Sequence, residues 1–209
     1  MNFSTFFSMQ ARKPSGIFGK IVMSFVFDKG NSFLNGFTNE VMSIRPDERI
    51  LDIGCGTGKL VKVMSDQITS GQIDGIDFSG AMVSIARKRN KKNISTGKVK
   101  ILEGDFNTLS FPNNFYDKIC TVNTLYFWSE PMATAQKAAD ILKPGGKFVV
   151  AFEDIEQLEK RNLNRDVFSF YKADDVKNLL AESGFSGDSG TVSRTKGIRK
   201  FHCVVAEKQ

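Results

Sequence analysis

Three glycines stand at alternate positions, 54, 56 and 58, within the stretch RILDIGCGTGKL that spans residues 49–60. Glycine weakens regular structure, so this spacing is typical of a backbone that adopts unusual torsion angles or that another group approaches closely. The loop follows a short apolar run and precedes a helix-like pattern. Its amide groups are therefore expected to point toward a ligand at the start of that helix.

The residues around the glycines distinguish between two ligands, a nicotinamide or flavin dinucleotide and S-adenosylmethionine. A dinucleotide fingerprint, G-x-G-x-x-G, would need its third glycine at position 59, where this chain has lysine. The loop reads D-x-G-x-G-x-G instead, with Asp52 two residues before Gly54. A pyrophosphate beside Asp52 would be repelled, whereas the ammonium group of an amino-acid moiety would be attracted. The pattern therefore favours S-adenosylmethionine.

Strand-like and helix-like segments alternate along the rest of the chain. Ser79 is expected to cap one helix and Pro131 to open another. Helices are expected at 31–44, 59–68, 79–92, 131–142 and 173–183, and strands at 49–53, 72–78, 98–105, 116–122, 147–152, 190–195 and 199–208. This order predicts a doubly wound α/β fold with a mostly parallel, seven-stranded sheet and a terminal antiparallel hairpin.

Five of these segments resemble, in order, the motifs of the class I S-adenosylmethionine-dependent methyltransferases. LDIGCGTG looks like the first motif, GIDFS the second, EGDF the third, YDKICTVNTLYFW the fourth and LKPGGKFVVAF the fifth. The resemblance implies a Rossmann-like methyltransferase domain over residues 31–209, with S-adenosylmethionine as its cofactor. The chain is similar to small bacterial members that are related to the quinone-biosynthesis methyltransferases.

The resemblance also implies which residues hold the cofactor. Asp77 would accept hydrogen bonds from both ribose hydroxyls, Asp105 would face the adenine amino group, and Phe106 would cover the adenine ring. Each acid could instead be an inert strand-end residue, but such residues at the ends of three successive strands favour a shared ligand. Asn123 would contribute its backbone carbonyl. The full expected set is Asp52, Gly54, Cys55, Gly56, Gly58, Asp77, Phe78, Asp105, Phe106 and Asn123.

Few residues are candidates for catalysis, and methyl transfer from a sulfonium depends mainly on positioning and exclusion of water. Tyr126, Glu153 and Asp154 follow the fourth and fifth strands, and they are the expected catalytic candidates. Tyr126 and Trp128 are expected to line an aromatic acceptor pocket, or else to pack under a lid. The single histidine, His202, is expected to be a buried, hydrogen-bonded core residue.

Composition bounds the remaining function classes. The three cysteines, at positions 55, 120 and 203, are far apart and odd in number, which predicts neither a disulfide framework nor a metal site and suits a cytoplasmic protein. No apolar run is long enough to cross a bilayer. The formal net charge is +6, and the basic cluster RKRNKK at 87–92 is expected to be a solvated helix end that points away from the cofactor, not a nucleic-acid site.

Residues 1–30 lie outside the sheet pattern and are expected to form an N-terminal helical cap or lid. A homodimer contact and a membrane-surface helix are the alternatives. The sequence thus predicts a cytoplasmic methyltransferase for a small, hydrophobic acceptor. The competing hypotheses are a methyltransferase acting on RNA or protein, a catalytically silent S-adenosylmethionine-binding partner protein and, third, a nicotinamide oxidoreductase.

Overall fold

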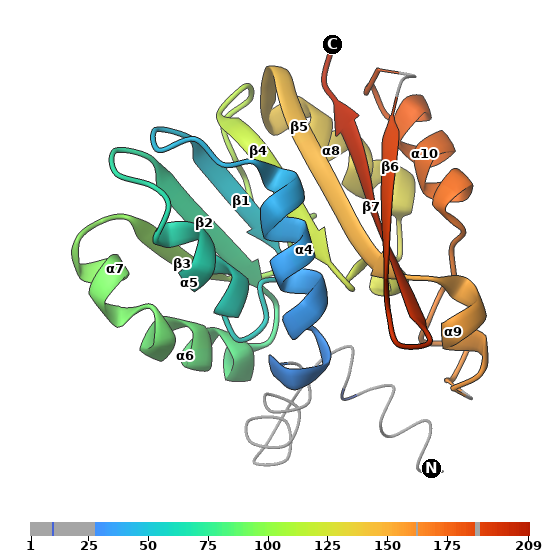
Figure 1. Cartoon of the computed structure of the whole chain (residues 1–209). Coiled ribbons are helices and arrows are strands. Elements are labelled where there is room, and N and C mark those ends of the chain that lie inside the picture. Colours follow the sequence, from blue (N-terminus) through green and yellow to red (C-terminus); the bar gives the residue numbers. More distant parts are fainter. Residues whose placement is uncertain (1–9, 11–27, 162, 187–188) are drawn as a thin grey trace.

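The computed structural model describes residues 10, 28–161, 163–186 and 189–209. In this part of the chain, seven strands form one sheet in the order β3-β2-β1-β4-β5-β7-β6 (Figure 1). The strands are β1 (Arg49–Ile53), β2 (Gln72–Asp77), β3 (Val99–Glu103), β4 (Tyr116–Val122), β5 (Leu142–Glu153), β6 (Gly190–Lys196) and β7 (Arg199–Glu207). β1 to β5 pair in parallel, and β7 is antiparallel to β5 and β6. The predicted doubly wound sheet with a terminal antiparallel hairpin is confirmed.

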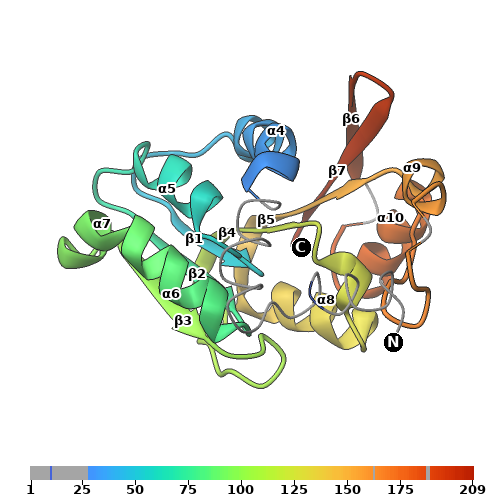
Figure 2. The same ribbon diagram turned by 90° about the horizontal axis from the view of Figure 1, so that it is seen from below.

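Helices cover both faces of the sheet. Helices α4 and α5 lie on one face and α8 on the other, as the view in Figure 2 shows. The described helices are α4 (Ser32–Met42), α5 (Lys59–Ser65), α6 (Gly80–Arg89), α7 (Lys91–Ser95), α8 (Pro131–Ile141), α9 (Ile155–Glu159), α10 (Ala173–Glu182) and the short 3₁₀ helix η2 (Leu125–Phe127). The connections from β1 to β2, from β2 to β3 and from β4 to β5 pass through helices, whereas residues 104–115 join β3 to β4 without a described helix.

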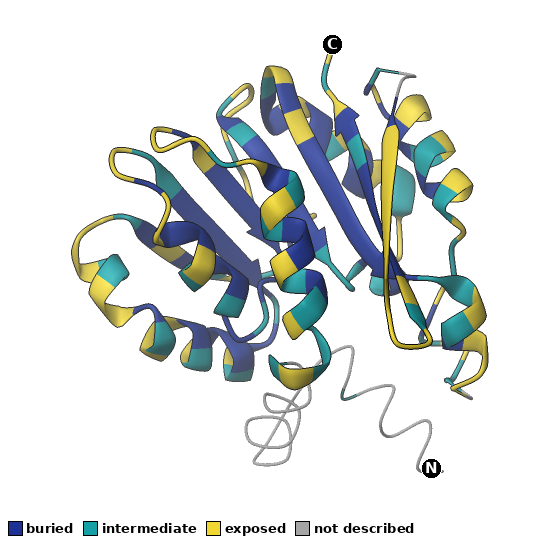
Figure 3. Cartoon of the chain, in the orientation of Figure 1, coloured by how far each residue is buried: buried dark blue, intermediate teal, exposed yellow. Residues whose placement is uncertain are grey.

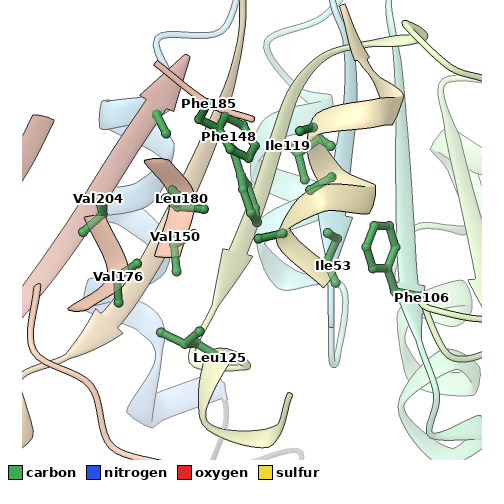
Figure 4. Close-up of a cluster of buried hydrophobic side chains, with 14 of the residues drawn as sticks. Ile53, Phe106, Ile119, Leu125, Phe148, Val150, Val176, Leu180, Phe185 and Val204 are labelled. Atoms are coloured by element: carbon green, nitrogen blue, oxygen red, sulfur yellow. The ribbon is translucent and has the colours of Figure 1, made fainter. Parts of the chain in front are cut away.

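Two apolar cores, one on each face, hold these layers together. In β5, Phe148, Val150 and Phe152 belong to one core, and the alternate residues Val149 and Ala151 belong to the other. Figure 4 shows the first core, where Phe148 and Val150 lie among side chains of α8, α10 and β7. The central strands are buried on both faces and β6 is exposed along its length (Figure 3). The central strands therefore form a rigid platform for the loops at their carboxyl ends.

Two predicted elements differ clearly from the structure, and the bounds of the others agree to within three residues. The helix expected over residues 79–92 is divided, because α6 ends at Arg89 and α7 begins at Lys91. β5 begins at Leu142 instead of residue 147, so the KPGG turn lies within the strand. The turn fits there because the register between β4 and β5 shifts: Tyr116 pairs with Leu142, but Lys118 pairs with Lys147. The extra residues of β5 therefore form a bulge-like irregularity beside β4.

The predicted N-terminal cap, residues 1–30, lies outside the described residues except for residue 10 and residues 28–30. The cap and the homodimer contact therefore stay predictions. Residues 28–30 are helical and lead into α4. Within the described ranges, no helix is both long and apolar enough to cross a membrane.

Candidate functional site

A cavity of about 850 Å³ opens at the carboxyl edge of the parallel strands, where open α/β sheets bind their ligands. The loops after β1, β2, β3, β4 and β5 all contribute to its lining. Figure 2 views this edge of the sheet, with α6 and β3 to one side and α9 and β7 to the other. The lining includes every predicted cofactor-binding residue except Gly58, together with Tyr126, Trp128 and Glu153.

The three loop glycines have positive φ angles of 73°, 54° and 69°, but they serve different purposes. A side chain at Gly54 would collide with the side chain of Thr124. One at Gly58 would collide with Ala86 of α6. A Cβ at Gly56 would meet no described atom within 4 Å, and Gly56 lines the cavity. Close packing therefore explains Gly54 and Gly58, and only Gly56 leaves its space to a ligand.

The carboxylate of Asp77 is fixed by two backbone groups. Its Oδ2 accepts a hydrogen bond from the N–H of Gly56 at 2.9 Å, and its Oδ1 accepts one from the N–H of Ser79 at 2.9 Å. Burial raises the pKa of Asp77 to about 6, and these two bonds oppose the shift. A carboxylate oxygen can accept more than one bond, so a ligand hydroxyl could share this group.

Asp52 is a buried carboxyl group without a cationic side chain beside it in the described structure. It is 2% exposed, and it accepts a weak hydrogen bond from the Sγ of Cys120 at 3.7 Å. Burial and, to a smaller extent, the charge of Asp77 raise the pKa of Asp52 to about 7, against the opposing effect of the hydrogen bond from Cys120. A ligand ammonium group would supply the counter-charge that Asp52 lacks.

The residues that follow β3, Asp105 to Asn107, line the cofactor region with an aromatic ring and a turn. The ring of Phe106 stacks on that of Phe111, with centroids 5.8 Å apart, and the ammonium of Lys137 lies 5.2 Å from the Phe106 centroid. Asp105 is exposed, and its Oδ1 accepts a hydrogen bond from the N–H of Asn107 at 2.9 Å. Asn107 also lines the cavity, and the sequence analysis missed it because no motif marks it.

Arg89 corrects the interpretation of the basic cluster. Its Nη2 lies 2.5 Å from the Oδ2 of Asp28, and its Nη1 donates to the backbone oxygen of Thr57 at 2.9 Å. Burial acts to raise the pKa of Asp28, but hydrogen bonds from Arg89 and Thr57 outweigh it and lower the pKa. Arg87 bonds to the carbonyl of Ile101. Part of the predicted solvated helix end thus packs against the glycine loop, because α6 crosses that loop.

Aromatic and aliphatic side chains line the other part of the cavity. Tyr126 accepts a hydrogen bond from the N–H of Glu153 at 2.7 Å and donates one to the Oδ1 of Asn123 at 3.0 Å. Burial raises the pKa of the Tyr126 hydroxyl. The ring of Trp128 stacks on that of Phe148, with the ring centroids 6.4 Å apart. The apolar lining of this part includes Phe127, Leu158, Leu163, Val167 and Phe168.

The two expected acid/base candidates point in different directions. Glu153 lines the cavity but is 2% exposed, and its two oxygens accept bonds from Arg199 at 2.8 and 2.9 Å. Asp154, which follows the end of β5, is absent from the described lining. It caps α9 and lies 2.8 Å from the Nε2 of His202. Both carboxylates therefore have structural partners, and their catalytic role stays a prediction.

His202 is confirmed as a buried, hydrogen-bonded residue. It is 4% exposed, and its Nδ1 lies 2.8 Å from the Oγ of Ser193. Among the described residues, no three His, Cys, Asp or Glu side chains gather closely enough to hold a metal ion.

Comparisons of the chain with known proteins gave the following matches. The methyltransferase domain family matches residues 50–146. The uncharacterized methyltransferase YdaC of Bacillus subtilis is 26% identical over 157 residues, which cover 73% of this chain and 84% of that protein. The ubiquinone/menaquinone biosynthesis C-methyltransferase UbiE of Coxiella burnetii is 33% identical over 140 residues, which cover 66% of this chain and 56% of UbiE. The chain thus spans little more than half of that second relative.

The chain also has the same fold as a solved methyltransferase structure. A S-adenosylmethionine-dependent methyltransferase from Aquifex aeolicus aligns with a TM-score of 0.74 and 20% identity, covering 90% of this chain and 98% of that one. The likeness confirms the predicted Rossmann-like fold, including the terminal antiparallel pair.

Proposed function

Because the chain belongs to the class I S-adenosylmethionine-dependent methyltransferases, we propose that it methylates a small, apolar molecule bound beside the cofactor. One observation carries the proposal. A single cavity joins a region of buried carboxylates and open backbone at the ends of β1 and β2 to a region of aromatic and aliphatic side chains beyond β4. The first region suits a cationic cofactor, and the second suits an apolar acceptor.

In this proposal the residues at the ends of β1, β2 and β3 hold the cofactor. Asp52 pairs with its ammonium group, Asp77 accepts bonds from the ribose hydroxyls, and Phe106 covers the adenine ring beside Asp105. Gly56 allows the backbone to approach. The cofactor supplies a methyl group that is already electrophilic, because it is attached to a positively charged sulfur.

The remaining residues act by positioning and by excluding water. The Nδ2 of Asn123 donates to the Oδ1 of Asn31 at 2.9 Å, and its Oδ1 accepts from Tyr126. The Tyr126 hydroxyl is also bonded to Glu153, so these two side chains together link the start of α4 and the ends of β4 and β5. We assign Tyr126 and Asn123 as positioning residues at the junction of the two regions. Trp128 and the apolar lining would enclose the acceptor.

The UbiE relative supports a small acceptor, since its name refers to the biosynthesis of ubiquinone and menaquinone. The basic cluster gives less support to RNA, because Arg87 and Arg89 are engaged with the protein itself. A methyltransferase for RNA or protein, and a silent S-adenosylmethionine-binding partner protein, are the competing hypotheses.

A methyl-transfer screen tests the proposal. Purified protein would be incubated with isotope-labelled S-adenosylmethionine and separate pools of apolar small molecules, total RNA, or protein extract. We expect label in a small molecule of the apolar pools. Label found only in RNA or protein would contradict the proposal, as would cofactor binding without transfer to any pool.

A further inference from the structure

Charged side chains are divided unevenly along the cavity. The carboxylates of Asp52, Asp77 and Asp105 line the cofactor region at the ends of β1, β2 and β3. Lys59 also lines this region, but it donates to the backbone oxygen of Asp28 at 3.0 Å. The guanidinium groups of Arg161 and Arg199 line the opposite region, after α9 and at the start of β7. A cationic cofactor would neutralise the first region. The second region invites a ligand of the opposite charge.

Glu153 balances only one of the two arginines. Arg199 donates to both of its oxygens, at 2.8 and 2.9 Å, in the bidentate geometry that makes such pairs strong. Arg161 adds a third bond, from Nη2 to Oε1 at 2.5 Å. The three side chains together carry one net positive charge. The Arg161 side chain is 41% exposed and the Arg199 side chain 33%, so Arg161 is the more accessible of the two arginines for a ligand.

The same region offers no free proton acceptor among the described residues. Glu153 accepts three bonds from arginines, and the Tyr126 hydroxyl is bonded to Glu153 and Asn123. His202 does not line the cavity and is bonded to Ser193 and Asp154. An acceptor that must lose a proton during the reaction would therefore find no base here.

We infer that the acceptor is an apolar molecule with an acidic oxygen, bound as an oxyanion by Arg161, which acts as the specificity-determining residue. The inference rests on the proposed function. When the oxyanion is methylated, the new O–C bond replaces the C–S bond of the sulfonium, whose electron pair stays on sulfur. No proton is released, so the reaction of an oxyanion needs no general base.

Calorimetry with matched pairs of probes tests this inference. The protein is first titrated with S-adenosylhomocysteine, and the saturated complex is then titrated with 2-naphthoate, 2-naphthamide, 7-hydroxycoumarin and coumarin at a pH where the hydroxycoumarin is ionised. At least one anion should bind about tenfold or more tightly than its neutral partner, as a charge-assisted bond implies. The naphthoate arm reports on carboxylates, and the hydroxycoumarin arm reports on phenolates.

Three variants assign the effect to the named side chain. Arg161→Gln should remove most of the preference for the anion, and Arg161→Lys should keep part of it because the charge remains. Arg165→Gln is the matched control, because Arg165 pairs with Glu159 and is absent from the described lining. Equal binding of anions and neutral probes, or a preference that survives Arg161→Gln, would overturn the inference. Failure to bind S-adenosylhomocysteine would instead overturn the proposed function.

Discussion

The backbone N–H of Gly56 donates to the Oδ2 of Asp77 at 2.9 Å, which joins the glycine loop after β1 to the carboxylate at the end of β2. The residue that leaves room for a ligand is thus bonded to the residue expected to hold its ribose. The two features that the sequence motifs mark separately therefore form one unit.

Removing the Asp77 carboxylate should weaken the cofactor site. We expect Asp77→Ala to reduce the affinity for S-adenosylmethionine by about 1.5–3 kcal/mol, because charge-assisted hydrogen bonds are lost. Asp47→Ala, at an exposed carboxylate, serves as the control. Calorimetric titration of both variants measures the difference. Unchanged affinity in Asp77→Ala would remove Asp77 from the cofactor site.

The glycines should separate into two classes. Gly56→Val should abolish cofactor binding, because its side chain would fill open space in the cavity, and its positive φ should cost some thermal stability without a collision. Gly54→Ala should lower the melting temperature and leave the cavity open, because a collision of its Cβ with Thr124 adds to the cost of the positive φ. Thermal melts and titrations with S-adenosylhomocysteine measure both properties. Normal binding by Gly56→Val would mean that the loop is no ligand cradle.

The raised pKa of Asp52 predicts a pH dependence. Its pKa rises from 3.8 to about 7, so the Asp52 carboxyl group stays protonated to a higher pH in the folded, ligand-free protein than in the unfolded chain. This contribution to stability is therefore complete below about pH 4 and is lost as the pH rises through 7. Cofactor binding should change in the opposite direction and strengthen between pH 6 and 8, because the ammonium needs the ionised carboxylate.

Titrations of S-adenosylmethionine at pH 6, 7 and 8 check this dependence. Asp52→Asn should bind more weakly at pH 8 and should lose most of the pH dependence. Parallel pH curves for the variant and the unmodified protein would show that another group controls binding.

Glu153→Gln distinguishes a counter-charge from a catalytic base. We expect it to lower the free energy of unfolding by about 3 kcal/mol, because Arg199 and Arg161 lose their charged partner. The rate at saturating substrate should fall far less than the roughly 100-fold or greater loss that follows removal of a general base. Chemical unfolding and single-turnover rates measure the two effects. A stable variant with a rate reduced to that extent would restore Glu153 as the base.

The ion pair between Arg89 and Asp28 should contribute to the stability of the glycine loop. Both side chains are largely buried, at 28% and 27% exposure, so their interaction is less screened than a surface pair. A double-mutant cycle of Arg89→Gln and Asp28→Asn should show a coupling of about 1 kcal/mol in the free energy of unfolding. Additive single effects would show that the pair does not stabilise the loop.

The sequence allowed the cofactor side of the site to be predicted in detail. Asp52, Asp77 and Asp105 end successive strands, and apolar periodicity locates strand ends well. The arginines of the acceptor side carry no local pattern. Arg199 meets Glu153 across 46 residues of chain, through the antiparallel register of β5 and β7. Such pairings depend on tertiary packing, which spacing along the chain does not reveal.

The same limit applies to Arg89 and the glycines. The run 87–92 predicts a basic helix end, but the crossing of α6 over the glycine loop turns Arg89 toward Thr57. That crossing also explains Gly58, whose missing side chain makes room for Ala86. The regular glycine spacing therefore predicted a loop that does line the cavity, while two of its three glycines meet packing needs.

Calorimetric titration with S-adenosylmethionine, S-adenosylhomocysteine and NADH in parallel tests the central claim most directly. Gly56→Val provides the control for binding at the loop. The account predicts that the first two ligands bind to the unmodified protein, that Gly56→Val binds neither, and that NADH does not bind. Binding of NADH alone, or of none of the three, would contradict it.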